Sequence, residues 1–125
     1  MDYTRFFAIV RRQWVRLANE RDGLFPFTMN DCVSVFRYFF EAFKHFRGED
    51  HPLINTEQVK TIIEEMPYVT NEHFEEIIDI PVCFYPPMID RYFKTKYENC
   101  DYRINHFFSG RIRELKFYEC MREAE

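Results

Sequence analysis

Glycine is scarce in this sequence, with three in 125 residues, and tryptophan occurs once. Three isolated glycines cannot build the glycine-rich loop that cradles phosphate groups in nucleotide-binding proteins. No apolar run approaches the ~18 residues that a membrane-spanning helix needs, and no basic region followed by an apolar stretch marks a secretory signal at the N-terminus. These absences predict a soluble protein of the cytoplasm without a membrane partner, and they indicate no small-molecule ligand.

The four cysteines lack the spacing of a metal site or of a disulfide framework. They are Cys32, Cys83, Cys100 and Cys120, without a CxxC pair, and no HExxH motif is present. Free thiols in a reducing compartment are the simplest interpretation. We therefore expect no metal and no other cofactor.

Two of these cysteines are candidate nucleophiles. Cys100 is followed six positions later by His106, and Cys32 lies near the start of a predicted helix, where the helix dipole can lower the pKa of a thiol. Neither carries a local signature of a catalytic cysteine, and cysteines on an apolar helix face usually pack as small hydrophobic residues. The sequence therefore predicts a protein that is not an enzyme.

Aromatic residues, by contrast, are abundant. Fifteen phenylalanines and eight tyrosines help to bring the aromatic fraction to 19%, whereas disordered chains are poor in such residues. The length suits one domain. We predict a single helical domain over residues 1–125. Its class is all-α, a compact bundle of five or six helices with one short extended, proline-containing segment near residues 80–86.

Apolar residues recur at helical spacing in six segments. The predicted helices cover about residues 3–21, 31–47, 56–66, 71–80, 87–97 and 102–118. Asn55 with Gln58 indicates a capping box at the start of the third helix. The apolar arc of the second helix spans about half of its circumference. We therefore expect this helix to be central, with Phe39 and Phe40 buried.

Two of the predicted helices depend on weaker signals. Thr70 or Asn71 is expected to cap the fourth helix, whose inward residues would be Phe74, Ile77 and Ile78. The sixth helix would bury a stripe that includes Ile112, Leu115 and Tyr118. Gly110 interrupts this stripe and predicts a kink, a break or a close helix crossing.

Charge is distributed unevenly along the chain. The formal net charge is −4 overall, but residues 1–21 hold five arginines and two acids, a net of +3. Residues 49–80 hold nine acids and one lysine, a net of −8. The sequence therefore predicts one basic and one strongly acidic region.

The basic candidates lie in the first and the last predicted helix. Arg5, Arg12 and Arg16 fall within about 40° of one another on a helix, and such a row can follow a phosphate backbone or bind an acidic partner. The other candidates for binding a partner or an anion are Asn105, His106, Arg111, Arg113 and Lys116. If the first and last helices are neighbours, these residues form one basic surface.

Arg111 falls inside the apolar stripe of the last helix. A buried guanidinium without a partner is costly. We therefore expect Arg111 to form an ion pair with an acid such as Asp90 or Glu41, to reach solvent, or to meet a partner or ligand.

Acidic candidates are concentrated in the third and fourth predicted helices. They are Glu64, Glu65, Glu72, Glu75 and Glu76. The separation of these two helices resembles that of a helix-turn-helix unit, but carboxylates would repel phosphate, so DNA reading by this pair is excluded. A docking face for a basic partner and an ordinary solvated acidic surface both remain open.

Three function classes follow from these patterns. The favoured one is a small non-enzymatic interaction module with separate basic and acidic faces, which binds a protein partner or associates with itself. The alternative is a nucleic-acid-associated accessory protein that uses the arginine row of the first helix. The third is a small enzyme without a recognisable motif.

Overall fold

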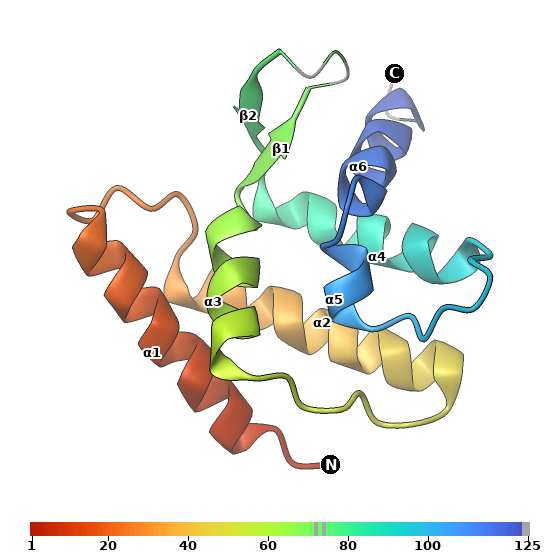
Figure 1. Cartoon of the computed structure of the whole chain (residues 1–125), viewed down its shortest axis with the longest axis horizontal. Helices are drawn as coiled ribbons and strands as arrows, with labels where there is room; N and C mark the ends of the chain where they lie inside the picture. The colour runs from red at the N-terminus through yellow and green to blue at the C-terminus, as the bar shows by residue number, and fades with distance from the viewer. Residues whose placement is uncertain (72, 74, 124–125) are drawn as a thin grey trace.

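The computed structural model describes residues 1–71, 73 and 75–123. Its described helices are α1 (Thr4–Glu20), α2 (Met29–Arg47), α3 (Thr56–Glu65), α4 (Tyr85–Lys94), α5 (Ile104–Phe107) and α6 (Ile112–Glu123), with a 3-10 turn at Val82–Phe84. Strands β1 (Tyr68–Thr70) and β2 (Ile77–Asp79) form a small antiparallel sheet after α3 (Figure 1). The predicted all-α class with five or six helices is confirmed.

Helix α2 is the centre of the core, as predicted. Phe39 is 0% exposed and Phe40 is 3% exposed, and α1 and α4 both pack on this helix. Thr28 and Asp31 form a reciprocal capping box at its start, and Gly48 ends it with a φ of 77°, in the left-handed region that glycine adopts without strain.

The prediction of a fourth helix over residues 71–80 is wrong. The chain instead forms the β1–β2 hairpin, in which Val69 lies opposite Ile78. Val69 is buried on the core side, while Ile77 is 71% exposed. β-branched residues favour this alternation of faces over a helical stripe. The expected inward position of Phe74 lies outside the described residues.

The proline-rich segment near residues 80–86 is extended only in part. Pro81 has extended backbone angles, φ −68° and ψ 145°, but the 3-10 turn follows at once and α4 begins at Tyr85. Pro86 and Pro87 fit in the first turn of α4, because a missing N–H there costs no helical hydrogen bond. Helix α4 ends at Lys94, so the predicted helical position of Tyr97 is wrong.

The sixth predicted helix is broken at Gly110, whose φ of 52° is left-handed. Because α5 and α6 are separate helices, α6 does not continue the apolar stripe of α5. Tyr118 is buried, but Leu115 is 50% exposed. In their place α6 buries the long side chains of Arg113 and Lys116, at 6% and 4% exposure.

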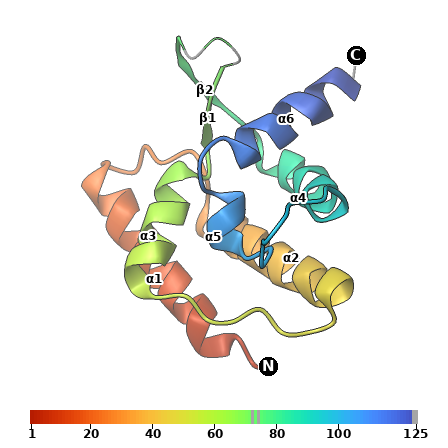
Figure 2. The same cartoon turned by 45° about the vertical axis from the view of Figure 1, so that its right-hand side comes forward.

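Helices α1 and α6 lie on different sides of the molecule. Helix α1 packs on α2 and α3, whereas α6 packs on α4 and α5. The two chain ends accordingly lie at opposite ends of the molecule in both views (Figures 1 and 2). The condition for a single basic surface, that the first and last helices are neighbours, is therefore not met. No described helix combines the length and the apolar character needed to cross a membrane.

Candidate functional site

A groove follows α3 on the side that faces the hairpin, α5 and the start of α6. It consists of two adjoining hollows of about 360 and 340 Å³ that share Glu65 and Phe108 as lining residues. We call it the α3 groove. Its lining residues are Asn55, Glu57, Gln58, Thr61, Ile62, Glu64, Glu65, Tyr68, Val69, Thr70, Ile77, Asn105, Phe108, Ser109, Gly110, Arg113 and Glu114.

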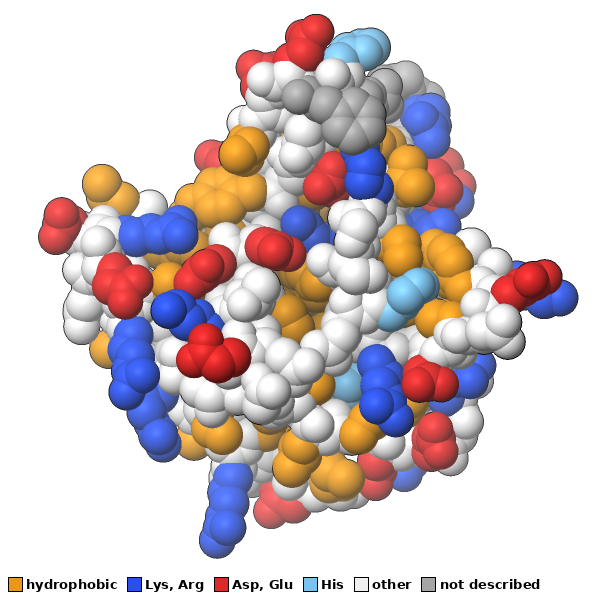
Figure 3. All heavy atoms as spheres, in the orientation of Figure 1, with side chains coloured by type: hydrophobic (Ala, Val, Ile, Leu, Met, Phe, Trp, Pro, Cys, Tyr) orange, Lys and Arg blue, Asp and Glu red, His pale blue; other side chains and the backbone are white. Residues whose placement is uncertain are grey.

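Carboxylates dominate the charge of the groove. No ion pair joins Glu57, Glu64 or Glu65 to another described residue, whereas Glu114 pairs with Arg111 at 3.3 Å. Several acidic side chains are visible around α3 on the face shown in Figure 3. The groove is thus lined by four carboxylates, those of Glu57, Glu64, Glu65 and Glu114, and by one cation, Arg113.

Glu65 is the carboxylate that the groove perturbs most clearly. Burial raises its pKa; the nearby Arg113 lowers it, and the repulsion of Glu64 and Glu114 raises it further. The net shift is upward, so the charged form of Glu65 is disfavoured in this setting. A cation bound in the groove would relieve this repulsion and stabilise the carboxylate.

Arg113 forms part of the groove wall rather than a surface cation. Its Nη1 donates to the Tyr85 hydroxyl at 3.3 Å, and its guanidinium lies 5.1 Å from the ring centroid of Phe108. Tyr85 in turn donates to the carbonyl of Met66 at 2.7 Å. Arg113 therefore connects α6 to the end of α3, and its 6% exposure is too small for a partner to reach it directly.

The two other cations of α6 are also engaged inside the molecule. Lys116 Nζ donates to Thr95 Oγ1 at 2.8 Å and lies 3.3 Å from a carboxylate oxygen of Glu119. Arg111 pairs with Glu114 and donates to the hydroxyl of Tyr118 at 3.4 Å. An ion pair of Arg111 was expected, but the proposed acids were wrong.

Asp90, one of those acids, instead accepts a hydrogen bond from the hydroxyl of Tyr38 at 2.8 Å. Hydroxyl oxygens and nearby carboxylates accept hydrogen bonds from the cations of α6, so these residues contribute to the packing of the C-terminal half.

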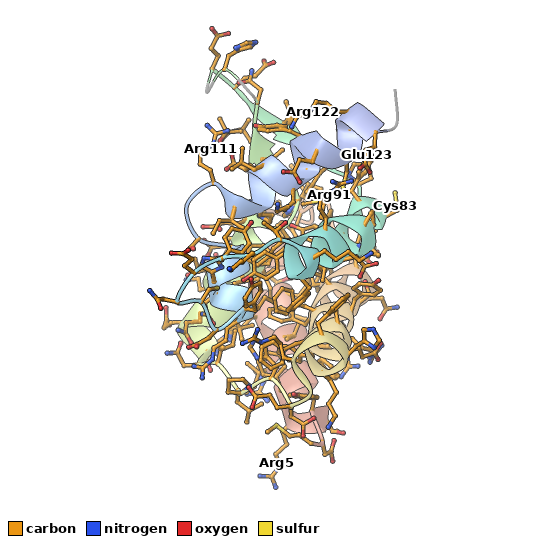
Figure 4. All side chains as sticks on the ribbon, turned by 90° about the vertical axis from the view of Figure 1, so that its right-hand side faces the viewer. Arg5, Cys83, Arg91, Arg111, Arg122 and Glu123 are labelled. Atoms are coloured by element: carbon orange, nitrogen blue, oxygen red, sulfur yellow. The ribbon has the colours of Figure 1, made fainter. Side chains whose placement is uncertain are left out.

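The arginine row of α1 is exposed as predicted. Arg5, Arg12 and Arg16 all lie on the surface, and no ion pair joins them to the described residues. Basic side chains follow α1 at the lower left of Figure 3, and Arg5 points away from the body in Figure 4. Since α1 packs on α3, the basic row and the acidic groove belong to neighbouring helices.

The remaining candidate binding residues lie in different parts of the structure. Asn105 lines the α3 groove opposite Glu57 and thus joins the acidic candidates Glu64 and Glu65. Glu75 and Glu76 are exposed on the hairpin segment, and Glu72 lies outside the described residues. No described group of three or more His, Cys, Asp or Glu side chains has the arrangement of a metal site.

His106 lies beside Cys100, with 3.3 Å between Nδ1 and Sγ. Cys32, the other candidate nucleophile, is buried in the core, as expected of a cysteine on an apolar helix face. Burial raises the pKa of Cys32 to about 12, because the apolar core outweighs the effect of the nearby helix start. Cys32 is therefore a packing residue.

Sequence reasoning missed the part of the groove formed by the hairpin and by Phe108. Tyr68, Thr70 and Ile77 line it only because the chain turns back after β1. The alternation of apolar residues around Val69 was the local signal for a strand, but no glycine-containing turn marks the hairpin.

A scan against protein-family models and searches of curated proteins and of solved structures found no match to this chain.

Proposed function

We propose that the chain is a non-enzymatic protein-interaction module whose α3 groove binds a basic, extended segment of a partner protein. The observation that carries the proposal is the set of glutamates in the groove, Glu57, Glu64 and Glu65, without an ion pair to the described residues. Lysine or arginine side chains of a partner complement this charge and accelerate its approach.

The hairpin supports an extended form of the bound segment. Tyr68, Val69 and Thr70 of β1 line the groove, and in the described chain β1 pairs with a strand only on the β2 side. A strand with a free edge can accept an added strand through backbone hydrogen bonds. The exposed Ile77 adds apolar contact area beside the carboxylates.

Removing two charges of the groove is expected to weaken binding of a basic peptide. The probe is a short fluorescent peptide of alternating arginine and alanine, and the variant is Glu64→Gln, Glu65→Gln. Two partly exposed ion pairs of about 0.5–1 kcal/mol each correspond to roughly a five- to thirty-fold increase in Kd. Fluorescence anisotropy at low ionic strength measures the change.

A matched control is Glu20→Gln, Glu49→Gln, which removes the same charge from two exposed positions outside the groove. This control should bind the peptide nearly as the wild type does. Equal weakening by both variants would show that only the overall charge matters, and no binding by the wild type would reject the proposal.

The arginine row of α1 supports a second candidate, an accessory protein that contacts nucleic acid. Its basis is the exposure of Arg5, Arg12 and Arg16 without ion pairs to the described residues. DNA-duplex binding that falls steeply with salt and is lost in Arg12→Glu, Arg16→Glu would favour it over the groove. A solution mass above that of one chain, lowered by salt and by the same variant, would identify α1 of a second copy as the basic segment.

A further inference from the structure

A cluster of polar, reactive groups surrounds Cys100, in the loop that joins α4 to α5 at the right of Figure 1. The Sγ atom lies 3.3 Å from Nδ1 of His106 and 3.9 Å from the hydroxyl of Tyr92. The backbone N–H of Tyr102 donates to the same sulfur at 3.2 Å. Tyr92 and His106 also contact each other at 2.7 Å.

We propose that Cys100 is a nucleophilic thiol, activated by His106, and that it is a site of covalent modification by small electrophiles. His106 Nδ1 takes the thiol proton, and the resulting thiolate attacks the electrophilic carbon. With iodoacetamide as the electrophile, an S–C bond forms, the C–I bond breaks and iodide leaves with the bonding electrons. The proton then passes from the imidazolium to water.

Three donors converge on the sulfur once the proton has moved. They are the N–H of Tyr102, the Nδ1–H of the imidazolium and the hydroxyl of Tyr92, which can turn from nitrogen to sulfur. Hydrogen bonds to a charged group favour the charged form. Burial raises the pKa of Tyr92 above its ordinary value, so its hydroxyl keeps the proton that it donates.

His106 suits the role of proton acceptor. Burial lowers the pKa of its imidazole, so the ring is neutral near pH 7 and one of its nitrogens can accept a proton. The step uses the tautomer with the proton on Nε2, in which Nδ1 accepts from the Tyr92 hydroxyl at 2.7 Å, and this contact fixes the orientation of the ring.

The charged neighbours of the cluster come from several elements. Arg47 of α2 lies 4.8 Å from the ring centroid of Tyr102, and Lys116 of α6 lies 5.7 Å from that of Tyr97. Both cations favour a nearby anion, whereas Glu98 and Asp101 of the loop are exposed and oppose it.

The loop around Cys100 is held in place by a tyrosine. The hydroxyl of Tyr102 accepts from the N–H of Tyr97 and donates to the carbonyl of Thr95, both at 2.8 Å. Cys100 itself is half-buried, which admits a small reagent and disfavours a large one. The fixed loop therefore keeps the sulfur beside its three donors.

Cys83 provides an internal reference because it is the exposed thiol among the four cysteines. Iodoacetamide is added in limiting amount to the whole chain near pH 7, and peptide mapping by mass spectrometry gives the rate at each thiol. Cys100 is expected to react about ten-fold faster than Cys83, despite its lower exposure, as activated thiols do.

The variant His106→Gln distinguishes activation of the Cys100 thiol by His106 from the access of the reagent to that thiol. It should slow Cys100 by about ten-fold near pH 7 and leave Cys83 unchanged. The difference should vanish near pH 10, where thiols ionise without a base. Cys100 reacting no faster than Cys83 in the wild type would overturn the proposal. So would a rate at Cys100 that His106→Gln leaves unchanged, or slows equally at both pH values.

Discussion

Replacing Phe39 by alanine is expected to lower the free energy of unfolding by about 3–5 kcal/mol, the range for emptying an aromatic site in a core. Phe39 is 0% exposed. Its ring lies 5.1–6.0 Å from those of His51, Tyr92, Phe93 and Phe107, which come from three further parts of the chain. Urea unfolding, followed by circular dichroism, measures the change.

Phe46 provides the control on the same helix. It is 39% exposed, although it stacks on Phe93 at 5.5 Å. Phe46→Ala should therefore cost much less, about 1 kcal/mol, because most of the emptied space is filled by solvent. Equal losses in the two variants would show that α2 is not the centre of the core.

Acid is expected to destabilise the protein through His51, a histidine of the core. His51 is 0% exposed and stacks on Phe40 at 4.5 Å. Its Nε2 accepts from the N–H of Ile104 at 3.0 Å, and its Nδ1 lies 2.6 Å from the carbonyl of Pro52. This pairing requires the neutral ring with the proton on Nδ1, and burial lowers the pKa to about 4.

The direction in which stability changes with pH follows from proton binding at His51. Between about pH 4 and pH 6.5 the unfolded chain binds a proton at this histidine and the folded chain does not, so stability rises with pH. The contribution of neutral His51 to the free energy of unfolding is complete above about pH 6.5 and is lost as the pH falls to about 4. Its size is roughly 3 kcal/mol, since one pKa unit corresponds to about 1.4 kcal/mol.

The variant His51→Gln isolates this contribution, because its amide oxygen can accept from Ile104 without titrating. The variant should be less stable near pH 7, but its stability should change much less between pH 6.5 and pH 4. His106, whose pKa is also lowered, titrates in both proteins and cancels in the comparison. Parallel curves for wild type and variant would contradict the assignment.

Helices α1 to α3 follow from local signals in the sequence. The box formed by Asn55 and Gln58 satisfies two backbone donors within one turn, whatever the rest of the chain does. The hairpin depends instead on contact between Val69 and Ile78, nine positions apart. Such pairing competes with helical spacing, and a short apolar run does not distinguish the two.

Of the α3 groove, the sequence predicted only the negative charge. Glu64 and Glu65 were expected to face a basic partner, and they line the groove. Arg113 and Lys116 were expected on the surface because cations are rarely buried. The hydroxyl oxygens of Tyr85 and Thr95 accept hydrogen bonds from these cations inside the fold, and these partners lie 28 and 21 positions away along the chain.

The most direct test of whether the α3 groove is the binding surface is to map where a basic peptide binds. Backbone amide shifts of the isotopically labelled protein are followed while the arginine–alanine peptide is added. We expect the largest shift changes in α3, in β1 and in residues 105–114, and we expect them to decrease with salt. Changes confined to α1 or to other faces, or no changes at all, would contradict this expectation.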